Sequence, residues 1–408
     1  MPVLRPPDSW RVVLALVLLL QSAASTPLAP GRERSSPSPI ARFDAATFDA
    51  LVEDGIRRGA YPSAVLVVGR RDSVLFAKGY GHFTWARTSP PADPESTLYD
   101  LASLTKVLAT APALMLLVER GLVRLEAPVG AYVLEFRGAG TEAVTVRHLL
   151  AHTSGLRPTL PLWREAEDSE TALRMVLAAT PVVPPGTRVL YSDLNAILLG
   201  EIVRRVTGEP LDVFVGRELF TPLGLRHTLF RPFRSPFARA RTAPTGIWRG
   251  RPVSGVVNDQ NAARLGGVAG HAGLFATALD VARFAQFMLH EGALPDGRRL
   301  LRAETVRDFV AKAAPPAEWA EAGEARTLGW QAVPTGETVS SAGTLFGPSS
   351  YGHTGWTGTS LWIDPERDLF VVLLTNRAYA PRARRSLTIV KEVRGRVADV
   401  AARAADAR

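Results

Sequence analysis

The chain has 408 residues, of which 46% are hydrophobic, and it contains no cysteine. Enough apolar residues are present for one large core or two smaller ones, so the composition excludes a disordered chain, and the missing cysteines exclude disulfide bonds. The formal net charge of +9 comes mainly from arginines that are scattered among acidic residues, and we therefore expect no nucleic-acid partner.

The first 25 residues have the pattern of an export signal. Arg5 and Arg11 precede the apolar run "VVLALVLLL", and the small residues of "QSAAS" follow it. This order is typical of a cleavable signal peptide, which we predict over residues 1–25, and it indicates a periplasmic or secreted protein. An uncleaved anchor is the alternative and would be the only membrane contact, although the run is short for a membrane span.

The next segment, residues 26–42, is rich in proline, serine and arginine and has no apolar period. That composition predicts a flexible linker. The folded part should therefore begin near Phe43.

Both ends of the folded part carry strand patterns. Residues 63–81 contain two runs of β-forming residues around a polar turn, and residues 359–377 repeat this pattern with Asp364 and Pro365 at the turn. Each segment predicts a β-hairpin. Near the C-terminus, valines at positions 390, 393, 397 and 400 have the spacing of a helix that lies on a sheet.

The middle of the chain is mainly helical in pattern, for example in residues 194–208, where Gly208 is a stop signal. Strands at both ends and helices between them predict an α+β fold, in which both chain ends form an antiparallel sheet flanked by helices and a mainly helical region is inserted. We expect one domain over residues 43–408. Its α/β part would comprise residues 43–100 and 270–408, and its helical part residues 101–269.

Ser103 and Lys106 lie three residues apart, just before the uncharged run 107–118. On a helix this spacing puts both side chains on one face, and the helix N-terminus favours a developing negative charge. The chain has only four lysines, and a lysine, unlike an arginine, can exchange a proton, so the pair suggests proton transfer. The structural alternative is a Ser103 N-cap with Lys106 in solvent. The run itself predicts a buried helix with a kink at Pro112.

Two further segments carry polar residues of interest. Tyr191 precedes an apolar helix and is a candidate proton relay. The alternative for Tyr191 is a packed aromatic side chain whose hydroxyl has a hydrogen-bond partner. For Asp193, the favoured interpretation is the N-cap of that helix. In "YGHTGWTG", glycines around His353 would let the backbone approach a ligand closely. Taken alone, this last segment is a glycine-rich turn entering a strand.

Together the three segments resemble a known family. Ser103-Leu-Thr-Lys106, Tyr191-Ser-Asp193 and His353-Thr-Gly355 are similar, in order, to the S-x-x-K, Y-x-N and K/H-T-G motifs of the penicillin-recognising serine hydrolases. Residues 144–156 and 266–289 also resemble the class C β-lactamase-like branch, which includes D-Ala-D-Ala peptidases and esterases. The resemblance runs from about residue 43 to the C-terminal helix and implies the β-lactamase/transpeptidase-like fold.

The resemblance implies a serine acyl-enzyme mechanism without a cofactor or metal. Ser103 would be the nucleophile, and Lys106 and Tyr191 would share the work of base and proton relay. Asp193, His353, Thr354 and Gly355 would contact substrate, and the oxyanion would be bound by the backbone N–H groups of Ser103 and Trp356. The list of implied site residues is Ser103, Lys106, Tyr191, Asp193, His353, Thr354, Gly355 and Trp356.

The chain departs from the family pattern at two positions. Asp193 replaces the usual asparagine, and an ionised aspartate cannot donate a hydrogen bond to a substrate amide. For this reason β-lactamase is the least favoured of the expected activities. His353 replaces lysine, and its charge near neutral pH is left open.

Other histidines and serines suggest different chemistry. His148 and His152 have a spacing that can hold zinc, but no third ligand is evident, and we interpret them as structural. Ser154 lacks a G-x-S-x-G context. The glycine-rich segment around His271 lacks dinucleotide-binding spacing and predicts a tight loop that lines the cleft.

The sequence therefore predicts an exported serine hydrolase that acts on a peptide or small-molecule ester or amide, with carboxypeptidase or carboxylesterase favoured over β-lactamase. The alternative is a non-catalytic protein that binds peptidoglycan or β-lactams in the same cleft.

Overall fold

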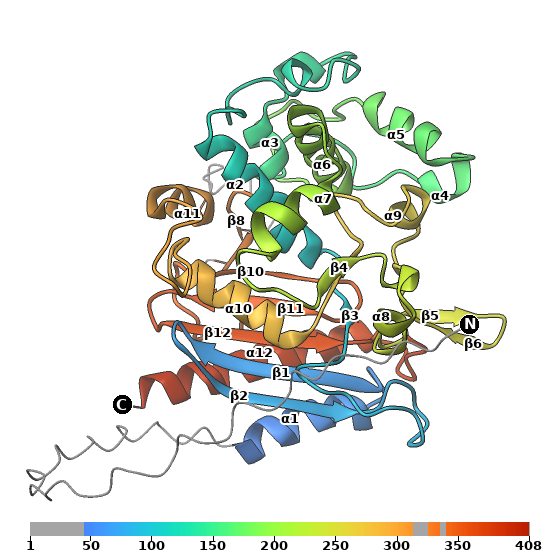
Figure 1. Cartoon of the computed structure of the whole chain (residues 1–408), viewed down its shortest axis with the longest axis vertical. Coiled ribbons are helices and arrows are strands. Elements are labelled where there is room, and N and C mark those ends of the chain that lie inside the picture. The colour runs from blue at the N-terminus through green and yellow to red at the C-terminus, as the bar shows by residue number, and fades with distance from the viewer. Residues whose placement is uncertain (1–44, 313–324, 335–339, 408) are drawn as a thin grey trace, which may run out of the picture. The chain divides into compact units, whose positions relative to one another are not determined.

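A seven-stranded antiparallel sheet, built from both ends of the chain, forms the centre of the computed structural model (Figure 1). The structure describes residues 45–312, 325–334 and 340–407. The predicted signal peptide, the predicted linker and Phe43 lie outside the described residues. The strand order is β2-β1-β12-β11-β10-β9-β8, with β1 (Ser63–Arg70), β2 (Ser73–Gly81), β8 (Ala325–Arg326), β9 (Gln331–Ala332), β10 (Tyr351–Thr354), β11 (Ser360–Asp364) and β12 (Leu369–Thr375).

Both predicted hairpins are confirmed. β1 pairs with β2 and β11 pairs with β12, in each case antiparallel. β1 also pairs with β12, for example at Val67 and Val372, so the first and last strands in the chain are neighbours in the sheet. Local turn signals defined the hairpins, whereas the pairing of β1 with β12 joins segments that are about 300 residues apart.

The sheet is buried on both faces, as the side chains of β1 show. Val65 and Val67 belong to the larger core beneath the helical region, whereas Leu66 and Val68 face the opposite way. The second core is closed by α1 (Ala45–Arg57) and by α12 (Ser386–Asp406). The predicted C-terminal helix on a sheet is therefore confirmed.

The larger core holds α10 (Ala278–Leu289), which packs against the sheet, and the helical region between β3 and α10. Figure 1 shows this region gathered above the sheet. Its helices are α2 (Ala111–Glu119), α3 (Val146–Leu150), α4 (Leu162–Glu165), α5 (Ser169–Leu177), α6 (Asp193–Thr207), α7 (Leu211–Val215), α8 (Pro236–Ala240) and α9 (Gln260–Arg264), and α11 (Ala303–Val310) follows α10.

Several short elements complete the fold. β3 (Tyr99–Asp100), β7 (Leu274–Ala276) and β4 (Thr228–Phe230) form a three-stranded sheet. β5 (Gly246–Trp248) and β6 (Arg251–Val253) form a separate hairpin. The π-helical turns are η1 (Lys106–Thr110) and η4 (Gly216–Phe220), and the 3-10 turns are η2 (Val129–Ala131), η3 (Thr141–Ala143) and η5 (Pro232–Arg234).

The buried helix after Ser103 begins with a wide turn. The π-helical turn η1 precedes α2, and Pro112 lies in the first turn of α2. Proline has no N–H and its ring displaces the carbonyl four residues back, so the five-residue spacing, in which the Ala111 N–H donates to the Lys106 carbonyl, accommodates it. The disturbance expected at Pro112 thus takes the form of a π-helical turn directly before it.

The described residues belong to one compact unit. Among them, none of the helices combines the length and the apolar character needed to cross a bilayer.

Candidate active site

Ser103 lies in a tight turn between β3 and η1. The preceding residue, Ala102, has a φ of 46°, a left-handed conformation that costs an alanine about 1 kcal/mol or more. Asp100 holds this turn, because its carboxylate accepts the Ala102 N–H at 2.9 Å and the Asn258 N–H at 2.7 Å. Strain that is held by surrounding contacts is characteristic of functional sites.

Lys106 is the polar centre of the site. Its Nζ donates to Ser103 Oγ at 3.1 Å, to Asp193 Oδ1 at 2.8 Å and to the carbonyl oxygen of His271 at 3.2 Å. The Lys106 side chain is only 3% exposed, so the alternative in which it points into solvent is wrong. The predicted proximity of the hydroxyl and the amine is present.

The charges of Lys106 and Asp193 depend on each other. Burial alone would favour the neutral form of each side chain, but the Asp193 carboxylate raises the pKa of Lys106, and Lys106 in turn lowers the pKa of Asp193. The resting site therefore contains an ammonium–carboxylate pair. Of the two conditions under which a buried lysine is tolerated, a polar surrounding or a lowered pKa, the structure has the first.

Asp193 does not cap its helix. α6 begins at Asp193 itself, Ser192 occupies the N-cap position, and no side-chain capping bond is formed there. The favoured interpretation of Asp193 as an N-cap is therefore wrong, because its carboxylate instead faces Lys106. At the other end of α6, Gly208 ends the helix with a φ of 73°, as predicted.

Tyr191 lies among aromatic and cationic groups. Its ring centroid is 4.6 Å from that of His152 and 5.9 Å from that of His353. Lys106 Nζ is 5.0 Å from the ring centroid, and the guanidinium carbon of Arg326 is 4.7 Å from it. Sequence analysis missed Arg326, because nothing near it in the chain marks β8 as part of the site.

The two histidines considered for zinc have structural contacts. His148 forms a capping box with Thr145 at the start of α3. His152 Nδ1 accepts the Ser192 N–H at 3.1 Å and lies 3.2 Å from the Asn195 amide nitrogen. Burial, followed by the charges of Arg326 and Lys106, lowers the pKa of His152 far below its usual value. The structural interpretation of this pair is confirmed.

His353 brings the third motif to Tyr191 from β10. Its side chain is buried, and Nδ1 donates to the Thr354 carbonyl at 2.8 Å. Burial, followed by the charges of Arg326 and Lys106, lowers the pKa of His353 far below its usual value. His353 is therefore neutral near pH 7 and does not supply the positive charge that a lysine would bring to this position.

The turn after β10 is tied to the segment that carries Ser103. The Thr357 hydroxyl donates to the Asp100 carbonyl at 2.6 Å, and the Thr359 hydroxyl donates to the Leu101 carbonyl at 2.9 Å. A methyl group on Gly355 would lie 2.5 Å from the Leu101 oxygen, so only glycine permits this approach.

Two backbone N–H groups remain available at this junction. Within the described part of the chain, neither the Ser103 N–H nor the Trp356 N–H donates a hydrogen bond. These are the two groups expected to bind an oxyanion. The structure therefore brings together the implied site residues from the turn after β3, from the start of α6 and from β10 with its following turn.

Sequence analysis also missed two buried arginines behind this turn. Arg394 of α12 donates to the carbonyls of Gly355 at 3.1 Å and Thr359 at 2.7 Å, and Arg377 Nε donates to the Trp356 carbonyl at 2.8 Å. Burial lowers the pKa of Arg394 to about 9. Arg394 falls between Val393 and Val397 on the apolar stripe of its helix, which is the signal that could have revealed it.

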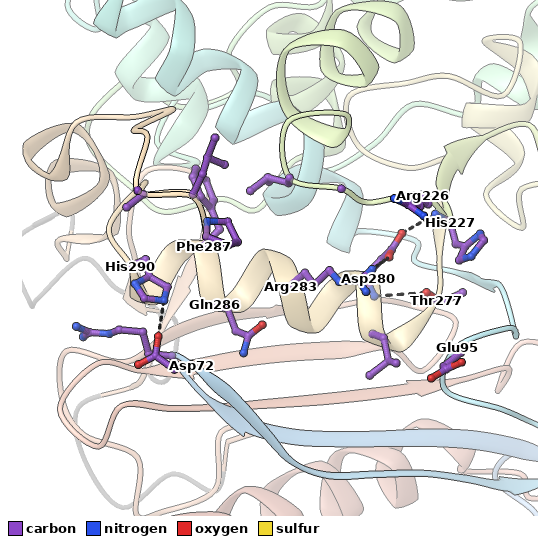
Figure 2. A pocket seen from close by; sticks show the side chains of 18 residues that line it. Asp72, Glu95, Arg226, His227, Thr277, Asp280, Arg283, Gln286, Phe287 and His290 are labelled. Atoms are coloured by element: carbon purple, nitrogen blue, oxygen red, sulfur yellow. Dashed lines mark hydrogen bonds and ion pairs between the residues drawn. The ribbon is translucent and has the colours of Figure 1, made fainter. Parts of the chain in front are cut away.

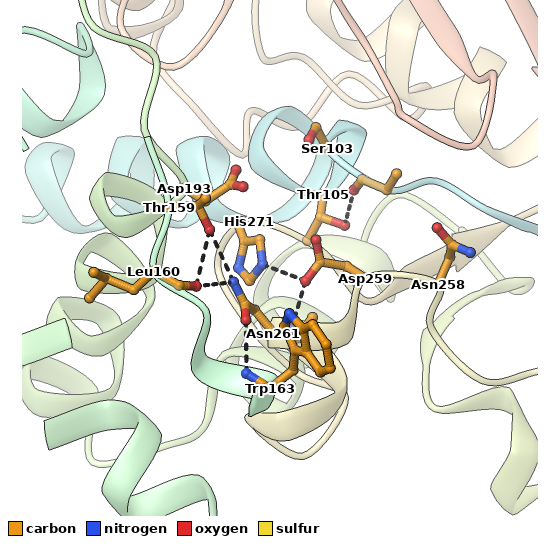
Figure 3. A network of polar contacts seen from close by, with 12 residues as sticks. Ser103, Thr105, Thr159, Leu160, Trp163, Asp193, Asn258, Asp259, Asn261 and His271 are labelled. Carbon is orange, nitrogen blue, oxygen red and sulfur yellow. Dashed lines mark hydrogen bonds and ion pairs between the residues drawn. The ribbon is translucent and has the colours of Figure 1, made fainter. Parts of the chain in front are cut away.

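A cluster of polar side chains adjoins Lys106. Atoms of Asp193, Asp259 and His271 that could bind a cation lie within 4.8 Å of one another, and Figure 3 shows the contact of His271 Nε2 with Asp259 at 3.0 Å. Burial opposes ionisation, but the hydrogen bond from His271 lowers the pKa of Asp259 to about 2. Because the Lys106 ammonium already binds Asp193, this cluster has a cation of its own. His271 lies in a tight loop beside the site, as predicted.

A cavity of about 990 Å³ lies along α10, away from Ser103 (Figure 2). Its polar groups are mostly paired with each other: Asp280 accepts the His227 N–H at 2.6 Å and pairs with Arg283 at 3.1 Å, and His290 pairs with Asp72 at 2.9 Å. None of the implied site residues lines it. We therefore place the candidate active site at Ser103 and not in this cavity.

Comparison with known proteins identifies the class. Residues 48–394 match the family described as Beta-lactamase, so the chain belongs to this family of serine hydrolases. The predicted family, the predicted α+β fold and the predicted enzyme class are confirmed.

Individual relatives are consistent with this assignment. A protein of Escherichia coli (strain K12) named "Putative D-alanyl-D-alanine carboxypeptidase" is 32% identical over 356 residues, which cover 79% of this chain and 80% of that protein. A penicillin-binding protein homologue from Caulobacter crescentus has a TM-score of 0.69 at 22% identity and covers 88% of this chain and 97% of that one. EstCE1, "a hydrolase with promiscuous acyltransferase activity", has a TM-score of 0.69 at 21% identity, with coverages of 88% and 100%. At these identities the two solved structures show a common fold.

Proposed function

We propose that this chain hydrolyses an acyl substrate through a covalent intermediate on Ser103, and that its substrate is a peptide ending in D-alanyl-D-alanine or an ester with a similar acyl group. The observation that carries the proposal is the contact of Ser103 Oγ with Lys106 Nζ at 3.1 Å, beside two N–H groups that donate no hydrogen bond to any described residue. The name of the E. coli relative supports the peptide substrate.

In the first step, Ser103 Oγ attacks the substrate carbonyl carbon while its proton moves to a base. An ammonium cannot accept a proton, and Lys106 is held in that form by Asp193. Tyr191 is therefore the proposed first base, and it takes the Ser103 proton as a phenolate anion, which becomes a neutral phenol. Lys106 Nζ lies 5.0 Å from the centroid of its ring and the guanidinium carbon of Arg326 lies 4.7 Å from it, so two cationic side chains contact the proposed base.

The tetrahedral intermediate would place its oxyanion between the N–H groups of Ser103 and Trp356. As it collapses, the leaving amine or alcohol takes the proton from Tyr191 and departs. Water then attacks the acyl-enzyme, Tyr191 accepts a proton from that water, and Tyr191 returns this proton to Ser103 Oγ as the ester bond breaks, which completes the cycle. Lys106 would hold the Ser103 hydroxyl and the Tyr191 phenol in position throughout these steps.

Asp193 bears on the kind of acyl group. Its Oδ1 is committed to Lys106, and an ionised carboxylate offers no N–H to a substrate amide. An ester needs no such donor, which supports carboxylesterase activity as a second candidate beside the carboxypeptidase. β-Lactamase activity remains the least favoured.

We further propose export, on the basis of the apolar run that follows Arg11. The mature chain would then reach cell-wall peptides outside the cytoplasm. Fractionation of the native cell, followed by N-terminal mass analysis, tests this proposal: an N-terminus near residue 26 in the exported fraction would support it, and recovery of the intact chain only in the cytoplasm would oppose it.

Steady-state turnover of an aryl ester, with Ser103→Ala alongside, tests the catalytic proposal. We expect repeated turnover by the natural chain and none by the variant. A non-catalytic binder would release at most one equivalent of phenol and would then stop, and an unchanged rate in Ser103→Ala would exclude Ser103 as the nucleophile.

Lys106→Arg is the second arm of this experiment. It keeps the charge, but the planar guanidinium does not fit the three contacts that the Lys106 ammonium makes with Ser103, Asp193 and the His271 carbonyl, so we expect turnover to be lost while the fold is retained. Turnover at nearly the rate of the natural chain would refute the proposed role of Lys106.

Incubation with penicillin, followed by measurement of the intact protein mass, distinguishes the two candidate activities. A peptidase would form a lasting penicillin adduct, and an esterase would not.

A further inference from the structure

One segment of the chain is strongly basic and also exposes aromatic side chains. Although arginines and acids are mixed over the chain as a whole, residues 222–258 contain seven arginines and no aspartate or glutamate. In the structure, residues 231–256 form η5, α8 and the β5–β6 hairpin. We call these residues the arginine–aromatic lobe. Figure 1 shows the β5–β6 hairpin projecting from the body of the structure.

The lobe exposes large apolar side chains, whose contact with water is unfavourable. Phe237 is 70% exposed, Trp248 is 67% exposed and Ile247 is 54% exposed, and Phe233 and Val256 are also exposed. Exposed apolar residues are ordinary when scattered, but a group of five within 24 residues marks an interaction surface.

The positive charge of the lobe is largely unneutralised. Arg231 pairs with Asp212, and Arg241 donates to backbone carbonyls. Across the described ranges, however, the exposed residues Arg234, Arg239, Arg249 and Arg251 form no ion pair. Such a surface is complementary to one that carries negative charge.

The hairpin presents the two kinds of side chain together. Trp248 pairs with Arg251 across the strands, so the two side chains share one face, and Ile247 pairs with Pro252. The guanidinium carbon of Arg249 lies over the Trp248 ring, 5.6 Å from its centroid. Tryptophan and arginine prefer the boundary between water and the hydrocarbon of a bilayer, where the ring is buried and the guanidinium meets headgroups.

The lobe adjoins the candidate active site. Asn258 Nδ2 donates to the Thr245 carbonyl at 2.8 Å, and the Asn258 N–H donates to Asp100, which holds the turn before Ser103. Docking through the lobe would therefore place the site close to the surface on which the lobe rests.

We propose that the arginine–aromatic lobe docks on an anionic lipid bilayer, with Trp248 and Ile247 at the headgroup boundary and the arginines on lipid phosphates. The exposed apolar side chains favour a bilayer over a nucleic acid or another soluble polyanion, which would leave Ile247 and Phe237 in water. The inference goes beyond the proposed hydrolysis and does not depend on it.

Sedimentation with vesicles tests the proposal on the full chain. We expect the fraction bound to phosphatidylcholine vesicles that contain phosphatidylglycerol to exceed that bound to pure phosphatidylcholine, and to fall at high salt. Arg249→Ser with Arg251→Ser should weaken binding by about tenfold or more, because each basic residue near an anionic surface contributes several-fold. Ile247→Ser with Trp248→Ser should weaken it similarly.

Matched controls lie on another part of the surface. Leu122→Ser with Leu134→Ser removes apolar groups that are 51% and 61% exposed, and Arg124→Ser with Arg137→Ser removes two exposed charges. These pairs should leave vesicle binding within about twofold of the natural chain. Aryl-ester turnover without vesicles should be unchanged in all lobe variants, which separates this test from that of the catalytic proposal.

A second measurement locates the contact, even if residues 1–44 also bind the vesicles. Lipids brominated near the headgroup should quench part of the tryptophan fluorescence, and Trp248→Phe should abolish that part. Equal binding by the lobe variants and the control variants, together with unchanged quenching in Trp248→Phe, would overturn the proposal. Binding to heparin or duplex DNA without binding to vesicles would also overturn it, in favour of a soluble polyanion.

Discussion

Lys106 and Asp193 illustrate how two residues determine each other's state. The Lys106 ammonium is only 3% exposed and would be unstable there without a counter-charge, which Asp193, 25% exposed, supplies in an ion pair at 2.8 Å. Removing one partner of such a pair is costly, because the remaining charge stays buried. Substitution of one member of this pair therefore tests whether Lys106 is charged in the folded protein.

We predict that Asp193→Asn lowers the free energy of unfolding by about 3 kcal/mol, because the Lys106 ammonium loses its counter-charge. Denaturant unfolding measures the change. Glu170→Gln, which removes an exposed ion pair with Arg174 at 3.2 Å, is the control and should cost less than about 1 kcal/mol. Equal effects of the two substitutions would contradict the pairing described here.

Arg394 acts on the site through the backbone. The carbonyl it binds, that of Gly355, belongs to the same peptide unit as the Trp356 N–H, so a cation on the carbonyl both orients this N–H and strengthens it as a donor. Neither Arg394 nor Arg377 forms an ion pair with a described residue.

We predict that Arg394→Met lowers kcat for an aryl ester by about tenfold, with little change in KM, because the donor matters most in the transition state. The affinity of a boronic acid that forms a tetrahedral adduct with Ser103 should fall in parallel. Arg396→Met, on the same helix and 58% exposed, is the control. A loss of stability without a loss of boronic acid affinity would indicate a purely structural arginine.

At the scale of elements, the site depends on the close approach of α6 to the loop before β7. Gly270 lies in this loop, and a methyl group there would come within 1.9 Å of the Ala196 carbonyl of α6. Thr110 of η1 also donates to the Gly270 carbonyl at 2.7 Å. The loop is therefore held between the helix that carries Asp193 and the turn that carries Lys106.

We predict that Gly270→Ala destabilises the protein by about 2–3 kcal/mol and reduces turnover, because α6 and the loop must separate to admit the methyl group. Thermal unfolding and ester turnover measure both effects. Gly216→Ala is the matched control, since nothing lies within 4 Å of its added methyl group and its φ of −58° is helical. We expect Gly216→Ala to be neutral or slightly stabilising.

At the scale of the whole molecule, both faces of the sheet are covered, and the site is embedded between the sheet and the helical region. His152 and His353 are buried there as neutral groups, and the pKa of each is held far below its usual value. In the unfolded chain the same side chains take up protons near pH 6.5. The folded state therefore loses stability as the pH falls below about 6.5, because only the unfolded state gains those protons.

We predict that His353→Gln makes the free energy of unfolding less sensitive to acid, by about 1.4 kcal/mol per pH unit between roughly pH 6 and pH 4.5. Urea unfolding at a series of pH values gives both slopes, and other ionising groups cancel in their difference. Parallel curves for the natural chain and the variant would show that His353 is protonated in the folded state.

The sequence by itself determined the elements and the motifs. Alternating β-forming residues and turn signals defined the two hairpins, valine spacing defined α12, and the order of three short motifs indicated Ser103, Lys106, Tyr191 and His353. These signals are local, because they depend on neighbours within a few residues, and the structure has each of these elements where the pattern indicated it.

Only the tertiary structure decided the charges and the partners within the site. The pairing of Lys106 with Asp193 spans 87 residues, and Arg394 reaches Gly355 across 39. Such contacts, and the burial that makes His353 neutral, arise when the sheet brings both chain ends together and the helical region covers it. Whether a group is charged depends on its distance to other charges and to water, and both distances are properties of the folded chain.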